Sequence, residues 1–231
     1  MIELFENIEF EPFILSFKLA GLTTIILFIF SVPLAWYLSQ TKSKLKPILE
    51  AITALPIVLP PSVLGFYILV VLSQNSPVGS FFEQTFGISL VFNFTSLVVA
   101  SCFYSLPFMV QPIQGGFESL NKNMLEASYI SGKSRFQTII KVALPNIKPA
   151  LLTAIIITFA HTVGEFGVVL MIGGSIEGET KVASVAIYEM VEIMDYGSAH
   201  IYSAIMVIIS FLVLLSVYIF NGKQGKKLGK F

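Results

Sequence analysis

The residues ASYISGKS, numbers 127–134, have the composition of a phosphate-binding loop with alanine in place of its first glycine. In such a loop a glycine, a lysine and a hydroxyl hold nucleotide phosphates, so the chain would hydrolyse a nucleotide. That chemistry needs a buried strand before the loop and a helix after it. The preceding residues SLNKNMLEA are polar with a helical period, which instead favours a helix, a glycine turn and a second helix.

A second group of polar residues lies within an apolar run. Thr158, His161, Thr162 and Glu165 recur at helical spacing and therefore share one face of a helix. An ionisable residue in an apolar span usually faces the interior of a bundle or an aqueous path. We expect neutral His161 to be a hydrogen-bond partner of Glu165, in preference to a metal ligand. No catalytic residue, cofactor or metal site is expected.

The composition places these residues in a membrane protein. Of the 231 residues, 55% are hydrophobic and 12% are charged, whereas soluble domains carry about 25% charged residues. The single cysteine, Cys102, lies in an apolar run. It excludes a disulfide framework or a two-cysteine metal motif, and a buried thiol is expected.

Long apolar runs predict an all-α, polytopic helical bundle that forms one transmembrane domain over residues 1–231. A membrane-crossing helix needs about 20 mostly apolar residues. Five runs meet this length, at about residues 13–38, 48–72, 90–113, 150–172 and 201–220. The shorter run Val182–Met194 contains Glu189 and Glu192, so we expect a short interfacial or re-entrant helix there.

The basic residues orient the five spans. All but Lys18 and Lys181 of the 14 lysines and arginines fall in segments 42–46, 122–148 and 223–230, which share one side of the membrane. The positive-inside bias places these segments in the cytoplasm, with the amino terminus outside and the carboxyl terminus inside. The acidic amino terminus lacks the basic start of a cleaved signal peptide.

The predicted cytoplasmic loop at 118–149 has the pattern of two short helices at an angle, which we name the elbow. Gly132 suits the left-handed position that ends the first helix. Ser134 and Gln137 form a capping-box pattern that begins the second. Pro145 is expected to end it, and Pro149 suits the first turn of the next span. Apolar residues at helical spacing predict a face that covers the bundle or docks a partner: Phe136, Ile139, Ile140, Ala143 and Leu144.

The elbow resembles the EAA loop of permease subunits in binding-protein-dependent ABC importers. The matching residues are Glu126, Ala127, Ser128, Gly132, Phe136 within the apolar face, Leu144 and Pro145; Ser128 stands where the family has a second alanine. The resemblance implies that the elbow carries coupling helices that insert into a cleft of a separate cytoplasmic ATPase subunit.

Two further stretches, LPIVLPPSVLGFYILV in span two and GEFGVVLMIGGSIEGET after span four, resemble the molybdate subgroup of these permeases. The resemblance implies a homodimer in the cell membrane, served by a cytoplasmic ABC ATPase dimer and an extracytoplasmic oxyanion-binding protein. Sulfate and tungstate permeases share the architecture, so the identity of the oxyanion stays open. Nothing indicates a nucleic-acid partner.

Two features of the spans concern the translocation path. Pro56, Pro60 and Pro61 each remove a helix hydrogen-bond donor, so span two is expected to bend or break, either to line the pore or as a packing kink. A carboxylate repels a dianion, so Glu165 is expected to hold the outer gate by accepting hydrogen bonds. The expected gate residues are Thr158, His161, Thr162, Gly164, Glu165, Phe166 and Gly167, with Gly164 and Gly167 allowing close helix approach.

The sequence therefore predicts a transport subunit, not an enzyme, that moves a tetrahedral oxyanion, with molybdate first and sulfate or tungstate as alternatives. No lysine or arginine lies deep in a span, which suits a path that releases its anion readily. Two other classes stay open: a membrane-bound nucleotide-hydrolysing enzyme and a membrane anchor without a transport role.

Overall fold

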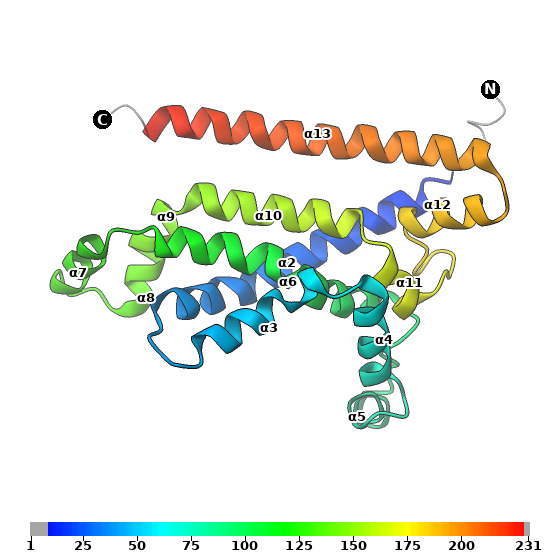
Figure 1. The fold of residues 1–231 in the computed structure, drawn as a ribbon, viewed down its shortest axis with the longest axis horizontal. Helices are drawn as coiled ribbons and strands as arrows, with labels where there is room; N and C mark the ends of the chain where they lie inside the picture. Colours follow the sequence, from blue (N-terminus) through cyan, green and yellow to red (C-terminus); the bar gives the residue numbers. More distant parts are fainter. Residues whose placement is uncertain (1–8, 229–231) are drawn as a thin grey trace.

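The computed structural model describes residues 9–228, and within this range every regular element is a helix. Four long helices run alongside one another and form the body of the molecule (Figure 1). They are α2 (Glu11–Gln40), α6 (Phe94–Glu118), α10 (Lys148–Val163) and α13 (Tyr196–Leu228). The predicted all-α bundle is confirmed.

The number of membrane spans agrees with the prediction when bent helices are counted as single spans. Three helices are long and apolar enough to cross alone: α2, α6 and the part of α13 at Tyr196–Ser216. Two bent pairs raise the number to five: α3 (Lys46–Val58) with α4 (Pro61–Leu72), and Arg135–Asn146 with α10.

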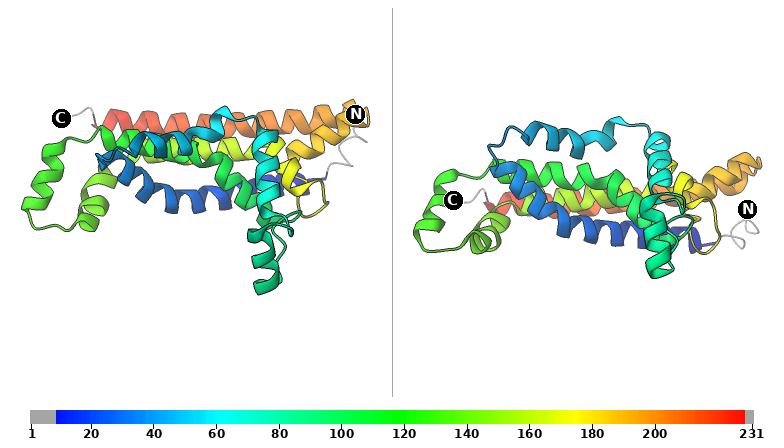
Figure 2. Two further views of the ribbon diagram at one scale, coloured as in Figure 1. Left: turned by 60° about the horizontal axis from the view of Figure 1, so that its bottom comes forward. Right: turned by 90° about the horizontal axis from the view of Figure 1, so that it is seen from below.

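Span two, expected at 48–72 with a bend or break at its prolines, is broken as predicted. The axis turns by 113° between α3 and α4. Pro60 lies in an extended conformation at the junction, and Pro61 opens α4, because neither has an N–H to continue the helix ladder. Pro56 lies buried inside α3 and does not end it. Figure 2 shows α4 leaving the long helices at a steep angle.

Span four is also broken, where a continuous helix was expected at 150–172. α10 ends at Val163 and α11 (Gly167–Gly173) begins after three residues. Phe166, with φ −126° and ψ −64°, lies outside helical geometry. The glycines on both sides of the break lower the cost of leaving the helix.

Two short helices flank the bundle. α12 (Ala183–Glu192) is the short helix predicted before the last span, and the amide of Ala183 donates to Ser16 Oγ of α2 at 2.9 Å. α5 (Pro77–Phe86) was not predicted. Its signals are present in the sequence, because Ser76 caps it, Pro77 opens it and Gly87 closes it in the left-handed conformation.

The core lies between α2, α6 and α10. Leu38, Met109, Ile113 and Ala154 are fully buried there. Outward apolar side chains are common on the long helices, such as Phe211 of α13 at 62% exposed. An apolar exterior around an apolar core is what a lipid solvent permits.

Candidate functional site

The elbow lies at one end of the bundle, and α11 and α12 lie at the other (Figure 1). The first helix of the elbow is α7 (Lys122–Ile130), and Gly132 follows it with φ +78°. The second helix begins with α8 (Arg135–Thr138). Its start is capped in both directions, because the Gln137 amide donates to Ser134 Oγ at 3.3 Å and the Ser134 amide donates to Gln137 Oε1 at 3.2 Å. The predicted helix–glycine–helix turn and its capping box are confirmed.

Ser128, which departs from the family's alanine, joins the two arms of the elbow. Its hydroxyl lies 2.9 Å from the hydroxyl of Thr138, and both side chains are buried. Each hydroxyl therefore satisfies the other in a place that water does not reach. The departure is matched by a partner on the facing helix.

Pro145 does not end the second helix, contrary to expectation. The helix continues from α8 through a π-helical turn, η1 (Ile139–Ala143), into α9 (Leu144–Asn146), which contains Pro145. The wider turn shifts the hydrogen-bond register just before the residue that has no N–H to donate. The chain then turns by 79° into α10, with Pro149 in its first turn as predicted.

The apolar face of the elbow is exposed in part. Phe136 is 72% exposed and Ile140 46%, while Ile139 is half-buried. Ile130, at the end of α7, is 88% exposed as well. Ala143 is buried and Leu144 is partly buried against the core. The expected face thus divides into an anchored base and an exposed tip, and the tip is free to dock a partner. Glu126 is also exposed, on α7.

The breaks in spans two and four touch each other. A Cβ placed on Gly167 would lie 2.9 Å from Cβ of Pro61, and one placed on Gly65 would lie 2.8 Å from Cβ of Met171. The expectation of close approach is confirmed for Gly167. It is wrong for Gly164, which is exposed and whose Cβ would find no atom nearer than 3.7 Å.

Glu165 lies in the break of span four and is 3% exposed. Neither carboxyl oxygen has a hydrogen-bond partner of acceptable geometry among the described residues, and the nearby hydroxyl of Ser101 also lacks one. The main-chain carbonyl of Glu165, in contrast, accepts from Ser184 Oγ of α12 at 2.6 Å. The outer helix α12 therefore holds the backbone of the break, while the carboxyl is buried without a partner.

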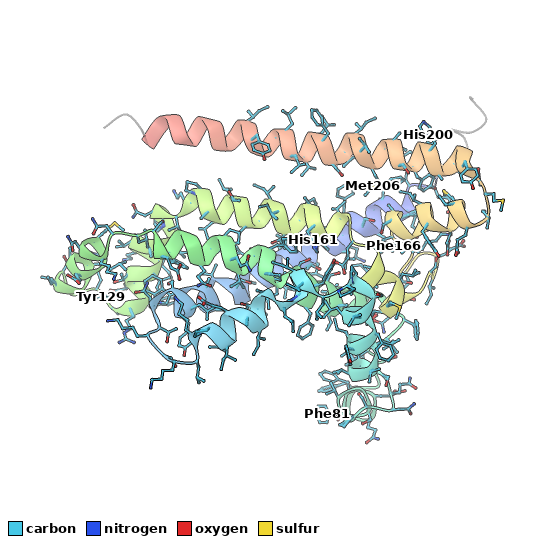
Figure 3. All side chains as sticks on the ribbon, in the orientation of Figure 1. Phe81, Tyr129, His161, Phe166, His200 and Met206 are labelled. Carbon is cyan, nitrogen blue, oxygen red and sulfur yellow. The ribbon has the colours of Figure 1, made fainter. Side chains whose placement is uncertain are left out.

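Helical spacing predicted that His161 pairs with Glu165, and this prediction is wrong. The helix ends at Val163, before it reaches Glu165. Instead His161 Nδ1 lies 2.9 Å from Ser105 Oγ, which also lies 2.9 Å from Thr162 Oγ1. Thr162 Oγ1 in turn donates to the carbonyl of Thr158 at 3.0 Å. Figure 3 shows His161 on α10 and Phe166 just beyond its end. The polar face of span four therefore lies against α6, inside the chain.

Sequence reasoning missed a polar cluster that joins α3 to α6 near the elbow. Lys46 Nζ lies 3.0 Å from Glu118 Oε1 and 3.6 Å from Glu50 Oε1. Gln114 Nε2 donates to Glu50 at 2.6 Å and to Glu118 at 3.0 Å. The i,i+4 spacing within each pair was visible in the sequence, but the contact between the two helices was not.

The comparisons with known proteins agree with this geometry. Residues 20–230 match the family described as binding-protein-dependent transport system inner membrane component. The chain is 47% identical over 205 residues to the molybdenum transport system permease protein ModB of Azotobacter vinelandii, covering 88% of this chain and 90% of that one. It is 31% identical over 199 residues to the sulfate transport system permease protein CysT of Salmonella typhimurium, covering 86% and 72%.

Solved structures show the same fold at lower identity. A bacterial ABC transporter involved in the import of the acidic polysaccharide alginate matches with a TM-score of 0.79 at 18% identity, over 96% of this chain and 82% of that chain. The MetNI methionine ABC transporter in an inward-facing conformation matches with a TM-score of 0.69 at 18% identity, over 90% and 92%. The chain belongs to the family of binding-protein-dependent transport system inner membrane components.

Proposed function

We propose that this chain is the membrane permease of an ABC importer for molybdate. The observation that supports molybdate as the substrate is the 47% identity to the molybdenum permease ModB of A. vinelandii, over nearly the whole of both chains. Sulfate is the second candidate, because a sulfate permease is 31% identical; tungstate is a further tetrahedral oxyanion of this shape. As one transmembrane domain over residues 1–231, the chain provides the path and no catalytic group.

A separate cytoplasmic ATPase dimer hydrolyses ATP and binds the elbow. The support is the exposed apolar tip at Ile130 and Phe136, held on two helices that are locked by the capping box and the Ser128–Thr138 hydrogen bond. The residues assigned to coupling are Glu126, Ala127, Ser128, Gly132, Phe136, Leu144 and Pro145. A second copy of this chain completes the path, and an extracytoplasmic binding protein delivers the oxyanion.

The gate belongs to the break in span four. Its assigned residues are Thr158, His161, Thr162, Gly164, Glu165, Phe166 and Gly167, and the break at Pro60 and Pro61 supports it through Gly167. His161 and Thr162 contact Ser105 of α6 and so support the end of α10 next to the break. Pro56 contributes packing within α3.

The elbow faces the cytoplasm, with the amino terminus outside and the carboxyl terminus inside. Labelling of single cysteines in a Cys102→Ala background tests this orientation. An impermeant thiol reagent added outside should label Glu179→Cys, which is exposed near α12, and should leave Ser43→Cys untouched. Labelling of Ser43→Cys alone would reverse the orientation.

Uptake of labelled molybdate into cells that lack their own permease tests the function. The chain should restore uptake together with its ATPase and binding protein, and excess sulfate should compete weakly. Glu126→Lys should abolish the stimulation of ATP hydrolysis by loaded binding protein, while the chain still inserts in the membrane. Uptake of sulfate in place of molybdate would move the assignment to the second candidate.

A further inference from the structure

A cavity of about 550 Å³ opens between the elbow and the end of α2. It is lined by Trp36, Gln40, Tyr129, Lys133 and Arg135. Lys133 and Arg135 bracket the capped turn of the elbow, and α2 supplies Trp36 and Gln40. Figure 3 shows Tyr129 at the elbow end of the molecule. The cavity therefore lies where the bundle meets its coupling element.

The charge of this cavity is entirely positive. No carboxylate lines it, and among the described residues neither Lys133 nor Arg135 takes part in an ion pair. A neighbouring cavity of about 540 Å³ is lined by Glu118 and Glu126 and also by Lys42, Lys46 and Lys122. Its charges are therefore largely balanced, and the first cavity is the one suited to an anion.

The aromatic lining sets the depth of the cavity in the membrane. Trp36 lies four residues before the end of α2, roughly 6 Å along the helix axis. It packs edge-on against Phe117, with ring centroids 5.0 Å apart. Tryptophan and tyrosine gather at the level of lipid headgroups, where one side of the ring is apolar and the other is wet. Trp36 thus marks the headgroup level at the end of α2, and the cationic groups lie on the elbow.

We propose that this cavity binds the headgroup of an anionic phospholipid. Basic pockets between membrane helices suit lipid phosphates, and an aromatic floor suits the glycerol and upper acyl chain of the same molecule. A free phosphate or molybdate ion would bind the cations without contacting the aromatic rings of Trp36 and Tyr129. The lipid would bridge α2 and the elbow, which makes coupling sensitive to the surrounding lipid. This inference needs the membrane placement of the chain but not the identity of the transported anion.

Trp36 is the single tryptophan of the chain and lines the cavity, so its fluorescence reports occupancy directly. Phosphatidylglycerol brominated on the upper part of its acyl chains is titrated into the full chain in detergent. We expect stronger quenching than with brominated phosphatidylcholine. The double variant Lys133→Gln, Arg135→Gln should bind phosphatidylglycerol about 30-fold more weakly, because each cation near a lipid surface contributes roughly a factor of five.

Two matched variants separate the site from general charge and from folding. Lys44→Gln with Lys141→Gln removes the same charge from exposed positions outside the cavity and should leave the binding unchanged. Lys133→Arg with Arg135→Lys keeps the charge and should retain binding within a few-fold. Equal weakening in both glutamine pairs, or equal quenching by the two lipids, would overturn the proposal.

Two further outcomes distinguish other occupants. Inorganic phosphate at the same concentration should not displace the brominated lipid; displacement would assign the cavity to a free oxyanion. Native mass spectrometry of the permease–ATPase complex should still find phosphatidylglycerol bound to the wild type and not to the glutamine pair at 133 and 135. Loss of the wild-type lipid on ATPase binding would show that the ATPase occupies the cavity, and the lipid site would be rejected.

Discussion

Pro61 and Gly167 meet where two broken membrane helices touch, and there is no space between them for a side chain. A Cβ on Gly167 would lie 2.9 Å from Cβ of Pro61. The proline opens α4 and the glycine opens α11, so each residue both ends a break and contacts the other break. A movement of one break must therefore displace the other, because close-packed residues transmit displacement.

Gly167→Ala should damage this contact, while Gly164→Ala should be tolerated. The added methyl at 167 overlaps a rigid proline ring, and overpacking of this kind costs about 1–3 kcal/mol. The methyl at 164 meets nothing nearer than 3.7 Å. Thermal unfolding in detergent and molybdate uptake should both decrease for the first variant alone. Equal behaviour of the two variants would mean that the contact at Pro61 yields without cost.

The Ser128–Thr138 hydrogen bond should be measurable as a coupling energy. Ser128→Ala leaves the buried hydroxyl of Thr138 without its partner on α7, and a net hydrogen bond is worth about 1 kcal/mol. Thr138→Val has the converse effect. A double-mutant cycle on unfolding free energy should give a coupling of about 1 kcal/mol, with the double variant less destabilised than the sum. Strict additivity would mean that the hydroxyls are independent.

Gly132→Val should uncouple the ATPase while the chain still inserts in the membrane. The site has room for a side chain, but its φ of +78° strains a β-branched residue by about 1–3 kcal/mol. Gly87 is a matched control, because it ends α5 with φ +65° and also has free space. Binding-protein-stimulated ATP hydrolysis in vesicles should be lost in Gly132→Val and kept in Gly87→Val. Loss in both would indicate a general folding defect.

The elbow could be predicted from the sequence because its signals are local. A glycine turn, a capping box and a basic flank act within a few residues, and Gly132, Ser134 and Gln137 behave as their patterns indicate. The departure at Ser128 could be seen but not explained, because its partner Thr138 lies across the turn. The prediction that Pro145 ends the second helix was wrong, because a π-helical turn accommodates the proline inside the helix.

The region of the proposed gate was harder to predict because its geometry depends on tertiary contacts. Proline and glycine indicated that spans two and four could break, but not that the breaks would meet at Pro61 and Gly167. Helical spacing paired His161 with Glu165 only on the assumption that the helix continues past Val163. Hydropathy alone does not reveal a break of three residues, since the residues on both sides remain apolar.

The ion pair between Lys181 and Glu189 should stabilise the outer loop over a defined pH range. Their charged atoms lie 2.9 Å apart. The hydrogen bond that Lys181 donates to Glu189 raises the pKa of Lys181 above its usual 10.5. For Glu189, burial acts to raise the pKa, but the neighbouring hydroxyl of Ser175 and the ammonium of Lys181 outweigh it and hold the pKa below its usual 4.5.

The pH dependence of this stabilisation follows from the directions of the two pKa shifts. Stabilisation by Glu189 is complete above pH 4.5 and is lost as the pH falls through its lowered pKa, whereas that by Lys181 is lost as the pH rises through its raised pKa. The melting temperature of wild type minus that of Glu189→Gln should be constant near neutral pH, equivalent to about 1 kcal/mol or less, and should shrink in acid. A difference that grew in acid would contradict this assignment.

Glu165→Gln and Glu165→Leu separate the structural role of this carboxyl from its role in transport. In the described structure both carboxyl oxygens are buried without partners, and the nearby hydroxyl of Ser101 is also unpaired. A buried polar group that lacks a partner costs free energy, so neither substitution should lower the melting temperature in detergent. The break itself is held by Ser184 through the main-chain carbonyl of Glu165, which both variants retain. In the proposed gate, opening changes the shape of the break, and the polar atoms at 165 then find partners that they lack here. Glu165→Gln should therefore keep most molybdate uptake, and Glu165→Leu should lose most of it while remaining folded.

Ser184→Ala is the complementary control, because it releases the backbone and should lower stability. If Glu165→Leu transports normally, the carboxyl has no part in the gate; if Glu165→Gln abolishes uptake, its charge or its proton is what the gate uses.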